Sequence, residues 1–271
     1  MAARHRSTAW LRTLTLVFIS MVLVAPLIAF LLNAFARSWF YPHLIPQQWT
    51  LEAWARILSP QSDVLQAMGN SLLIAGVVTP TALLVGLPAG RALGLYTFRG
   101  KRLVEFLLLL PAIVPPLAVS MGLAVNFLRW GLAGNWVGVS IAHLVPVLPY
   151  TILIFSGIFN QYSLEHEQQA RALGAKSWAV IWYVTLPLIK PGIVVAGLFA
   201  FLISWSQYLL TLLIGSGRVI TLPILLFSSA AGGNNLTIAA QAILFTAPAL
   251  LLLLVTNRLL STDAVSGLGR L

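Results

Sequence analysis

Residues 163–192 read SLEHEQQARALGAKSWAVIWYVTLPLIKPG and form the longest polar interruption in the apolar C-terminal half of the chain. They hold three of the sixteen Lys and Arg residues and two of the six Asp and Glu residues. Apolar stretches flank them on both sides, each as long as the about 20 residues that cross a bilayer. The chain is therefore organised around a polar loop between two membrane-spanning segments.

The first part of this loop predicts a short helix. Ser163 is placed to cap it, and Glu165 and Glu167 lie in its opening turns, where the helix dipole favours negative charge. Glu167 precedes Arg171 by four residues, which is the favourable order for an ion pair. Gly174 predicts the end of the helix.

The second part predicts another short helix, with Ser177 as its cap and with Pro187 and Pro191 ending it. Ala170 and Gly174 are four residues apart, so one face of the first helix has little side chain. A partner would be able to approach the backbone closely on that face. From the helix chemistry alone, the alternative interpretation is a solvated amphipathic connector.

These residues resemble the cytoplasmic loop of permease subunits of binding-protein-dependent ABC importers, which has the form E-A-A, three residues, G, nine residues, I-x-L-P. The positions that match this spacing are Ala170, Gly174, Val184, Leu186 and Pro187, with Val for Ile. The positions that match its extended form, E-E-A-A-R-x-L-G-A, are Glu167, Arg171, Leu173 and Ala175. The chain departs from the pattern at Gln168 and Gln169, where the second Glu and the first Ala are usual.

The resemblance implies that the first helix of the loop is a coupling helix in a cleft of an ATPase subunit. The docking residues that it implies are Glu167, Ala170, Arg171, Gly174, Leu186 and Pro187. It also implies an ATP-driven importer of a small solute, in which this chain forms the translocation path. The complete importer would also contain two copies of an ATP-binding subunit, a second permease (identical or related) and a periplasmic or lipid-anchored solute-binding protein. Size and the 201–226 stretch look most like the polyamine, thiamine, iron and phosphonate branch.

Composition independently indicates a membrane protein. Of the 271 residues, 59% are hydrophobic and only 8% are charged, whereas soluble domains have about 25% charged residues. A net charge of +10 would suggest nucleic acid in a soluble protein, but the distribution of basic residues over the loops explains it better. Cysteine is absent, so the chain has no disulfide and no thiolate metal site.

Six apolar segments predict an all-α, polytopic bundle with about six transmembrane helices. They span about 13–35, 70–93, 103–128, 138–160, 191–214 and 238–259. The first exceeds the 7–15 apolar residues of a signal peptide, which predicts a retained helix. We expect a cytoplasmic segment 1–12, one permease domain 13–260 that contains the coupling loop 161–190, and a cytoplasmic tail 261–271.

The basic residues predict the orientation, because cytoplasmic loops carry an excess of Lys and Arg. With both termini in the cytoplasm, the cytoplasmic segments hold Arg4, Arg6, Arg12, Arg91, Arg99, Lys101, Arg102, Arg171, Lys176, Lys190, Arg258 and Arg270. The outer segments hold only Arg37, Arg56, Arg129 and Arg218. This bias predicts that the 163–192 loop lies in the cytoplasm, and the resemblance implies a multi-pass protein of the bacterial inner membrane.

Two features are candidates for the translocation path. The third apolar segment contains Pro115 in a proline-rich run, which indicates either an opening or a packing kink. The fifth has four polar residues with the spacing of one helix face, namely Ser204, Gln207, Tyr208 and Thr211. Their alternative role is hydrogen bonding between membrane helices. At the start of the second segment, Asn70 is a candidate cap.

The sequence lacks the chemistry of an enzyme or a cofactor protein. The stretch Gly94 to Lys101 has the wrong spacing for a phosphate-binding loop, so ATP would be hydrolysed by a separate subunit. The histidines are scattered and predict no metal site, and His143 is expected to pack against a hydrogen-bonding neighbour. The alternative function is a secondary carrier or channel that works without an ATPase. Proton-coupled carriers usually embed relay residues, which are scarce here.

Overall fold

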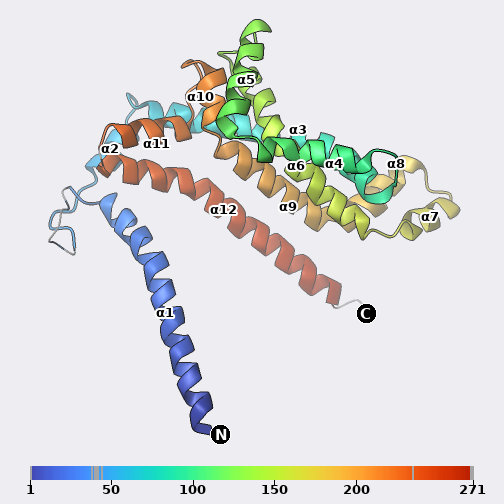
Figure 1. Ribbon diagram of the computed structural model, residues 1–271, viewed down its shortest axis with the longest axis horizontal. Helices are drawn as coiled ribbons and strands as arrows, with labels where there is room; N and C mark the ends of the chain where they lie inside the picture. The colour runs from blue at the N-terminus through green and yellow to red at the C-terminus, as the bar shows by residue number, and fades with distance from the viewer. Residues whose placement is uncertain (1, 38, 40–42, 44, 234, 269–271) are drawn as a thin grey trace. The chain divides into compact units, whose positions relative to one another are not determined.

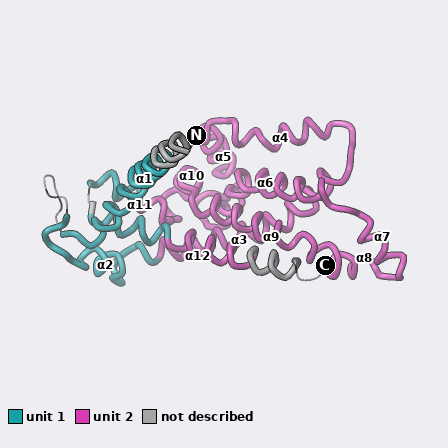
Figure 2. Tube along the Cα trace, turned by 90° about the horizontal axis from the view of Figure 1, so that it is seen from below, with its two compact units in different colours: residues 1–65, 226–246 teal, residues 66–225, 247–271 magenta. Residues whose placement is uncertain are grey.

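The computed structural model describes residues 2–37, 39, 43, 45–233 and 235–268, and within these ranges the regular structure is helical, without a strand (Figure 1). The chain divides into two compact units, residues 1–65 with 226–246 and residues 66–225 with 247–271 (Figure 2). The prediction of an all-α fold is confirmed for the described residues.

The first unit contains α1 (Ala2–Asn33), α2 (Glu52–Ile57), part of α11 (Leu222–Ala231) and the first third of α12 (Asn235–Leu268). The short helix α2 begins where the Thr50 hydroxyl accepts a hydrogen bond from the Glu52 N–H at 3.1 Å. Glu52 and Arg56 then form an i,i+4 ion pair of 3.0 Å on its exposed face.

The second unit contains the 163–192 loop and the helices around it. Its elements are α3 (Asp63–Leu95, from residue 66 on), α4 (Lys101–Ile113), α5 (Pro116–Arg129), α6 (Trp136–Asn160), α7 (Glu165–Ala172), α8 (Ser177–Val180), the π-helical η1 (Ile181–Thr185), α9 (Leu186–Trp205), α10 (Leu209–Gly215), the start of α11 and the rest of α12. Helices α6 and α9 lie side by side, and α4 also packs on α6 (Figure 1).

Five helical segments are long and apolar enough to cross a membrane: Arg12–Asn33, Asp63–Leu95, Trp136–Asn160, Ser177–Trp205 and Leu236–Leu259. A sixth candidate is the pair α4 and α5, which is bent by 99°. The prediction of about six spans is confirmed, but one was placed wrongly. The 103–128 segment coincides with the bent pair, whereas the 191–214 segment begins earlier, at residue 177, and stops at residue 205.

The prolines explain the break between α4 and α5. A residue before proline is pushed out of the helical region, and Val114 before Pro115 is extended, with φ −72° and ψ 137°. Pro115 precedes Pro116 and is extended in the same way, with ψ 128°. Pro116 then starts α5 at the position where proline fits a helix best.

Three glycines let α3 pack closely on α6. Gly86, Gly90 and Gly94 recur every four residues on one face of α3. A Cβ atom on Gly90 would lie only 2.4 Å from Phe155 Cβ, and one on Gly94 only 2.5 Å from Phe159 Cβ. Small residues at this spacing allow the backbones of membrane helices to approach each other. The contact brings the C-terminal end of α3 to the loop that follows α6.

A cluster of buried side chains joins α6 to α9 beside the same loop. Phe155 and Phe159 of α6 pack with Ile189 and Ala196 of α9, and each has at most 1% of its surface exposed. Packing of this kind stabilises membrane helices through van der Waals contacts. The base of the 163–192 loop is therefore fixed to a packed core.

Candidate functional site

Helix α7 forms as the sequence predicts. The Ser163 hydroxyl accepts a hydrogen bond from the Glu165 N–H at 3.2 Å. The helix ends where Gly174 adopts a left-handed conformation with φ +88°, and the Ala175 N–H then bonds to the Ala170 carbonyl at 3.0 Å. The predicted stop of this helix is confirmed, whereas Leu164 rather than Ser163 occupies its cap position.

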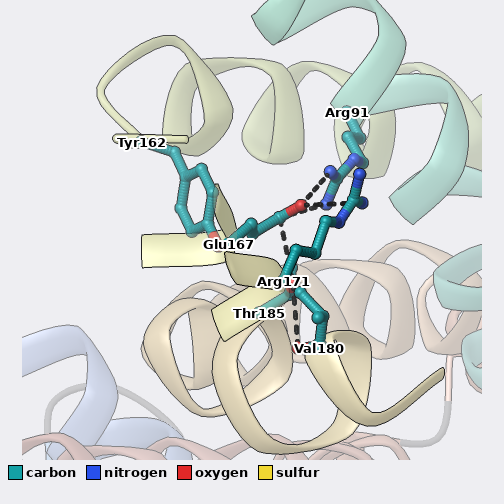
Figure 3. Close-up of polar contacts among 6 residues, drawn as sticks. All are labelled: Arg91, Tyr162, Glu167, Arg171, Val180 and Thr185. Carbon is teal, nitrogen blue, oxygen red and sulfur yellow. Dashed lines mark hydrogen bonds and ion pairs between the residues drawn. The ribbon is translucent and has the colours of Figure 1, made fainter. Parts of the chain in front are cut away.

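The carboxylate of Glu167 is buried and paired with Arg91 of α3, which is 76 residues away in sequence (Figure 3). Arg91 Nη1 donates to Oε1 and Nη2 donates to Oε2, each at 2.8 Å. This two-point geometry is the strongest form of the arginine–carboxylate contact. The Arg91 guanidinium also lies 5.5 Å from the centroid of the Phe159 ring, a cation–π contact.

Three further side chains complete the environment of Glu167 (Figure 3). The Tyr162 hydroxyl donates to Oε1 at 3.1 Å, and the Thr185 hydroxyl donates to the same oxygen at 3.0 Å. Arg171 lies 3.7 Å from Oε2, which confirms the predicted i,i+4 pair. We call these five residues the anchor: Arg91, Tyr162, Glu167, Arg171 and Thr185. The anchor joins α7 to α3 and to η1.

The anchor lowers the pKa of Glu167, chiefly because the Arg91 guanidinium hydrogen-bonds to its charged form. A lowered pKa contributes stability above the ordinary glutamate pKa of about 4.3, and this stability is lost as the pH falls through the lowered value. We expect the melting temperature of the purified chain to be constant between about pH 8 and pH 5 and to fall below about pH 4. A Glu167→Gln variant should show a smaller fall. An equal fall would assign the effect to other carboxylates.

A π-helical turn delivers Thr185 to the anchor. The segment from Ile181 to Thr185 is wound as a π-helix, and the Thr185 hydroxyl also lies 3.4 Å from the Val180 carbonyl oxygen, five residues back. Such turns occur as single insertions in α-helices, frequently at functional sites. The wider turn lets the hydroxyl meet Glu167 while the helix continues into α9.

The predicted second short helix of the loop is wrong in its start and its end. Lys176, not Ser177, occupies the cap position, and no side chain caps the helix. The helical path runs on to Trp205, with Pro187 in the first turn of α9 and Pro191 inside it. Proline is tolerated in a first turn, and a membrane bundle can satisfy the backbone groups that an internal proline frees.

An open groove of about 410 Å³ lies beside α7. The residues that line it are His166, Gln169, Ala170, Leu173, Tyr183, Val184, Pro187 and Leu188. Leu173 is 89% exposed and Tyr183 is 74% exposed. Large apolar side chains gathered at one exposed place mark a surface that contacts another molecule. Tyr183 lies in η1, so the π turn also shapes this groove.

The six predicted docking residues separate into two groups. Ala170 and Pro187 line the groove, and Arg171 and Gly174 are exposed next to it. Glu167 is buried in the anchor, and Leu186 is half-buried against the Phe155 and Phe159 cluster. The sequence indicated no role for Arg91, Tyr162 or Thr185 in this site. An isolated arginine at the end of an apolar span was the one available signal.

The five predicted path residues do not share one surface. Pro115 is exposed at the break before α5. Ser204 is buried in the last turn of α9 and Thr211 is buried in α10. Gln207 and Tyr208 lie in the break between those helices and are half-exposed. The predicted single helix face is therefore wrong, because the helix ends at Trp205 and restarts at Leu209.

Residues 82–264 match the family described as "Binding-protein-dependent transport system inner membrane component". The chain is 30% identical over 215 residues to the molybdenum transport system permease protein ModB of Mycobacterium tuberculosis, covering 74% of this chain and 81% of that protein. It is 30% identical over 237 residues to the putative 2-aminoethylphosphonate transport system permease protein PhnV of Salmonella paratyphi A, covering 86% and 88%.

The fold matches a solved structure as well. A chain of a bacterial ABC transporter involved in the import of the acidic polysaccharide alginate superposes with a TM-score of 0.74, covering 93% of this chain and 96% of that chain. The two sequences are 18% identical, so this likeness concerns the fold.

Proposed function

The chain belongs to the family of binding-protein-dependent transport system inner membrane components, and from this premise we propose how its loop and its broken helix act in transport. It is a multi-pass permease subunit of an ABC importer and a membrane component rather than the catalytic subunit. Two of its relatives are named for different solutes, molybdenum and 2-aminoethylphosphonate. An external solute-binding protein therefore delivers the cargo in our proposal, and its identity sets the solute.

An ATP-binding subunit docks on α7 and the groove beside it. The observation that carries this proposal is the anchor, which holds a polar helix firmly next to an exposed apolar groove. Leu173 at the end of α7 is almost fully exposed, and it fits the cleft of a partner protein. Ala170, Arg171, Gly174 and Pro187 face this partner. Glu167 and Leu186 support the docking surface from inside the chain.

The anchor also indicates how movement passes from the ATPase to the membrane. A load on α7 acts on α3 through the Arg91–Glu167 pair and on η1 and α9 through Thr185. In this proposal the loop and the ends of both helices move as one body. A hinge at Pro187 and Pro191 is not required, because both prolines lie within continuous helix.

We place the chain in a complex with two ATP-binding subunits and a second permease, identical or related to it. Both termini and the 163–192 loop face the cytoplasm, which agrees with the distribution of basic residues. The exposed apolar side chains of α4 and the other spans contact lipid or the second permease. The solute path passes the break at 206–208, with Gln207 and Tyr208 beside it, and the break at Pro115.

Replacing Gly174 with tryptophan tests the docking proposal. No described atom lies within 4 Å of the Cβ position of Gly174, so the chain itself has room for the new side chain. In the complex the indole would enter the docking interface, and overpacking costs about 1–3 kcal/mol. We expect co-purification of the ATP-binding subunit in mild detergent to fall about tenfold or more. ATP-driven uptake should fall with it, while the protein stays in the membrane.

Gly100 provides a matched control for backbone strain. It has the same φ of +88° and equally open surroundings, but it precedes α4, outside the 163–192 loop. Gly100→Trp therefore introduces the same side chain and the same strain. We expect it to retain the ATP-binding subunit. Equal retention by Gly174→Trp, or equal loss in both variants, would contradict docking at α7.

A further inference from the structure

The break between α9 and α10 has no cause in its own sequence. Residues 204–211 read SWSQYLLT, without proline or glycine. The helix nevertheless ends at Trp205 and restarts at Leu209. At the break the Gln207 N–H bonds to the Ser204 carbonyl at 3.3 Å, a tighter turn than an α-helix makes. Contacts from other helices can hold such a break in place.

His143 of α6 bridges the break from one side to the other. Its Nδ1 lies 3.0 Å from the Ser204 hydroxyl of α9, and its Nε2 lies 2.9 Å from the Thr211 hydroxyl of α10. The Thr211 hydroxyl also lies 3.1 Å from the Gln207 carbonyl oxygen. All three side chains are buried. His143 thus packs with hydrogen-bonding neighbours, as the sequence analysis expects.

One tautomer of a neutral ring satisfies all three contacts at once. The Nε2–H donates to the Thr211 oxygen, the Thr211 hydroxyl donates to the Gln207 carbonyl, and Nδ1 accepts from the Ser204 hydroxyl. In this arrangement both nitrogens of the His143 ring and both hydroxyl groups take part in a hydrogen bond. The bridge therefore ties together the last turn of α9, the break and the first turn of α10.

A closed seam between side chains lies next to the bridge and leaves no room for a water molecule. The side chains that line it are Ser71, Ile74, His143, Ser204, Trp205, Gln207 and Thr221. With the His143 ring neutral, none of these side chains carries a formal charge. Gln207 thus borders it from the break, and Thr221 borders it from the segment before α11. Contacts with these groups would be hydrogen bonds rather than ion pairs.

Asn70 and Ser71 hold the Thr221 side of this seam. The Asn70 amide donates to the Ile220 carbonyl at 2.8 Å, and the Leu222 N–H donates to the Ser71 hydroxyl at 2.9 Å. Asn70 therefore lies inside α3 and does not cap it, so that expectation was wrong. Between these two contacts, the Thr221 hydroxyl is buried and has no hydrogen-bond partner in the described part of the chain. An unpaired hydroxyl in a dry interior is unfavourable.

We infer that His143 is a positioning residue that holds the α9–α10 break against Thr221, so that Gln207 and Thr221 form a closed constriction of the solute path. This inference rests on the proposed function, because it places the path at the break. The polar groups on both sides suit an uncharged or hydrogen-bonding part of a solute. When the constriction opens, the Thr221 hydroxyl becomes available to that solute or to water.

Cysteine labelling tests this inference, because the natural chain contains no cysteine. Gln207→Cys and Thr221→Cys each create a single thiol, which reacts with N-ethylmaleimide only where water reaches it. In membranes without nucleotide, the thiol at the buried position 221 should react slowly, and the thiol at the half-exposed position 207 should react faster. Adding His143→Phe, which removes both bonds of the bridge, should raise each rate about fivefold to tenfold. His143→Gln keeps a hydrogen-bond donor and an acceptor, so its labelling rates should lie between those with His143 and those with His143→Phe.

Two variants keep the result independent of general misfolding. Ser140 lies on the same helix as His143 and is also buried, and its hydroxyl bonds only to the Trp136 carbonyl of that helix. Ser140→Ala should therefore leave both labelling rates unchanged. Thr211→Val removes only the α10 half of the bridge and conserves side-chain volume. Its effect should not add to that of His143→Phe, since both remove the same contact. Unchanged rates with His143→Phe and Thr211→Val, or an equal increase with Ser140→Ala, would overturn the positioning role.

Labelling of the purified complex with ATP and vanadate separates this inference from the proposed function. Trapping should accelerate the reaction at both thiols if the constriction opens during the ATPase cycle. An effect of His143→Phe without any effect of trapping would retain the positioning role of His143 and overturn the constriction. Failure of the ATP-binding subunit to co-purify would instead overturn the proposed function.

Discussion

Arg91→Ala is expected to abolish ATP-driven uptake and to release the ATP-binding subunit from the purified complex. The substitution leaves the Glu167 carboxylate buried without its arginine, and breaking a buried ion pair costs about 3–5 kcal/mol. The hydroxyls of Tyr162 and Thr185 cannot neutralise the charge, and Arg171, which is exposed and 3.7 Å away, is a weaker partner than Arg91. Helix α7 would leave its position even though no docking residue has changed. Subunit co-purification and the melting temperature of the isolated chain measure both effects.

Companion variants separate loss of the pair from loss of packing. Arg91→Lys keeps the charge but cannot form the two-point contact, so its effect should be intermediate. The double variant Arg91→Met with Glu167→Gln removes both charges and should melt at a higher temperature than Arg91→Ala. A double-mutant cycle on the two positions should give a coupling energy of about 0.5–3 kcal/mol. Additive effects at positions 91 and 167 would contradict the anchor.

Gly90→Ala is expected to destabilise the membrane bundle, because the packing of α3 on α6 leaves no room for a Cβ atom at this position. The new Cβ atom would lie 2.4 Å from Phe155 Cβ, 2.8 Å from the Ile152 carbonyl oxygen and 3.0 Å from the Ser156 nitrogen. Two of these atoms belong to the backbone of α6, so they cannot rotate away. The helices must separate, at a cost of about 1–3 kcal/mol or more. A fall in melting temperature and in yield from membranes would record the effect.

Gly76 on the same helix is the matched control. No described atom lies within 4 Å of its Cβ position. Alanine has less backbone freedom than glycine in the unfolded chain, so it stabilises a helix by about 0.5–1 kcal/mol relative to glycine. Gly76→Ala should therefore be neutral or stabilising. If Gly90→Ala melted at the same temperature as Gly76→Ala, the close approach of α3 to α6 would be incorrect.

Features that arise from one stretch of chain were predictable from the sequence. Hydropathy located the spans, because a membrane helix needs a fixed length of apolar residues. Gly174 marked the end of α7 and Ser163 marked its start to within one residue, because both act on the backbone nearby. The proline-rich run also located the break before α5, although its 99° bend was not predicted.

Features that depend on contacts between distant residues were not predictable. Arg91 and Glu167 are 76 residues apart, and each has an ordinary explanation by itself, one as a loop charge and one as a helix-start acid. The break at 206–208 depends on His143, so the local sequence predicted an unbroken helix. The π turn at 181–185 has no breaker residue, and its Thr185 is paired with Glu167.

The anchor constrains how such permeases can diverge and how they can be recombined. A substitution at position 91 alone leaves the Glu167 charge buried and unmatched, and one at position 167 alone leaves the half-buried Arg91 without its carboxylate. The two positions are therefore expected to change together during evolution. The same holds for chimaeras. A grafted segment 161–190 would carry Glu167 and Thr185 into a host that lacks a matching arginine. The grafted loop would then no longer be held in position against the end of α3. A transplant that also includes the end of α3 around Arg91 would keep the loop and its support together.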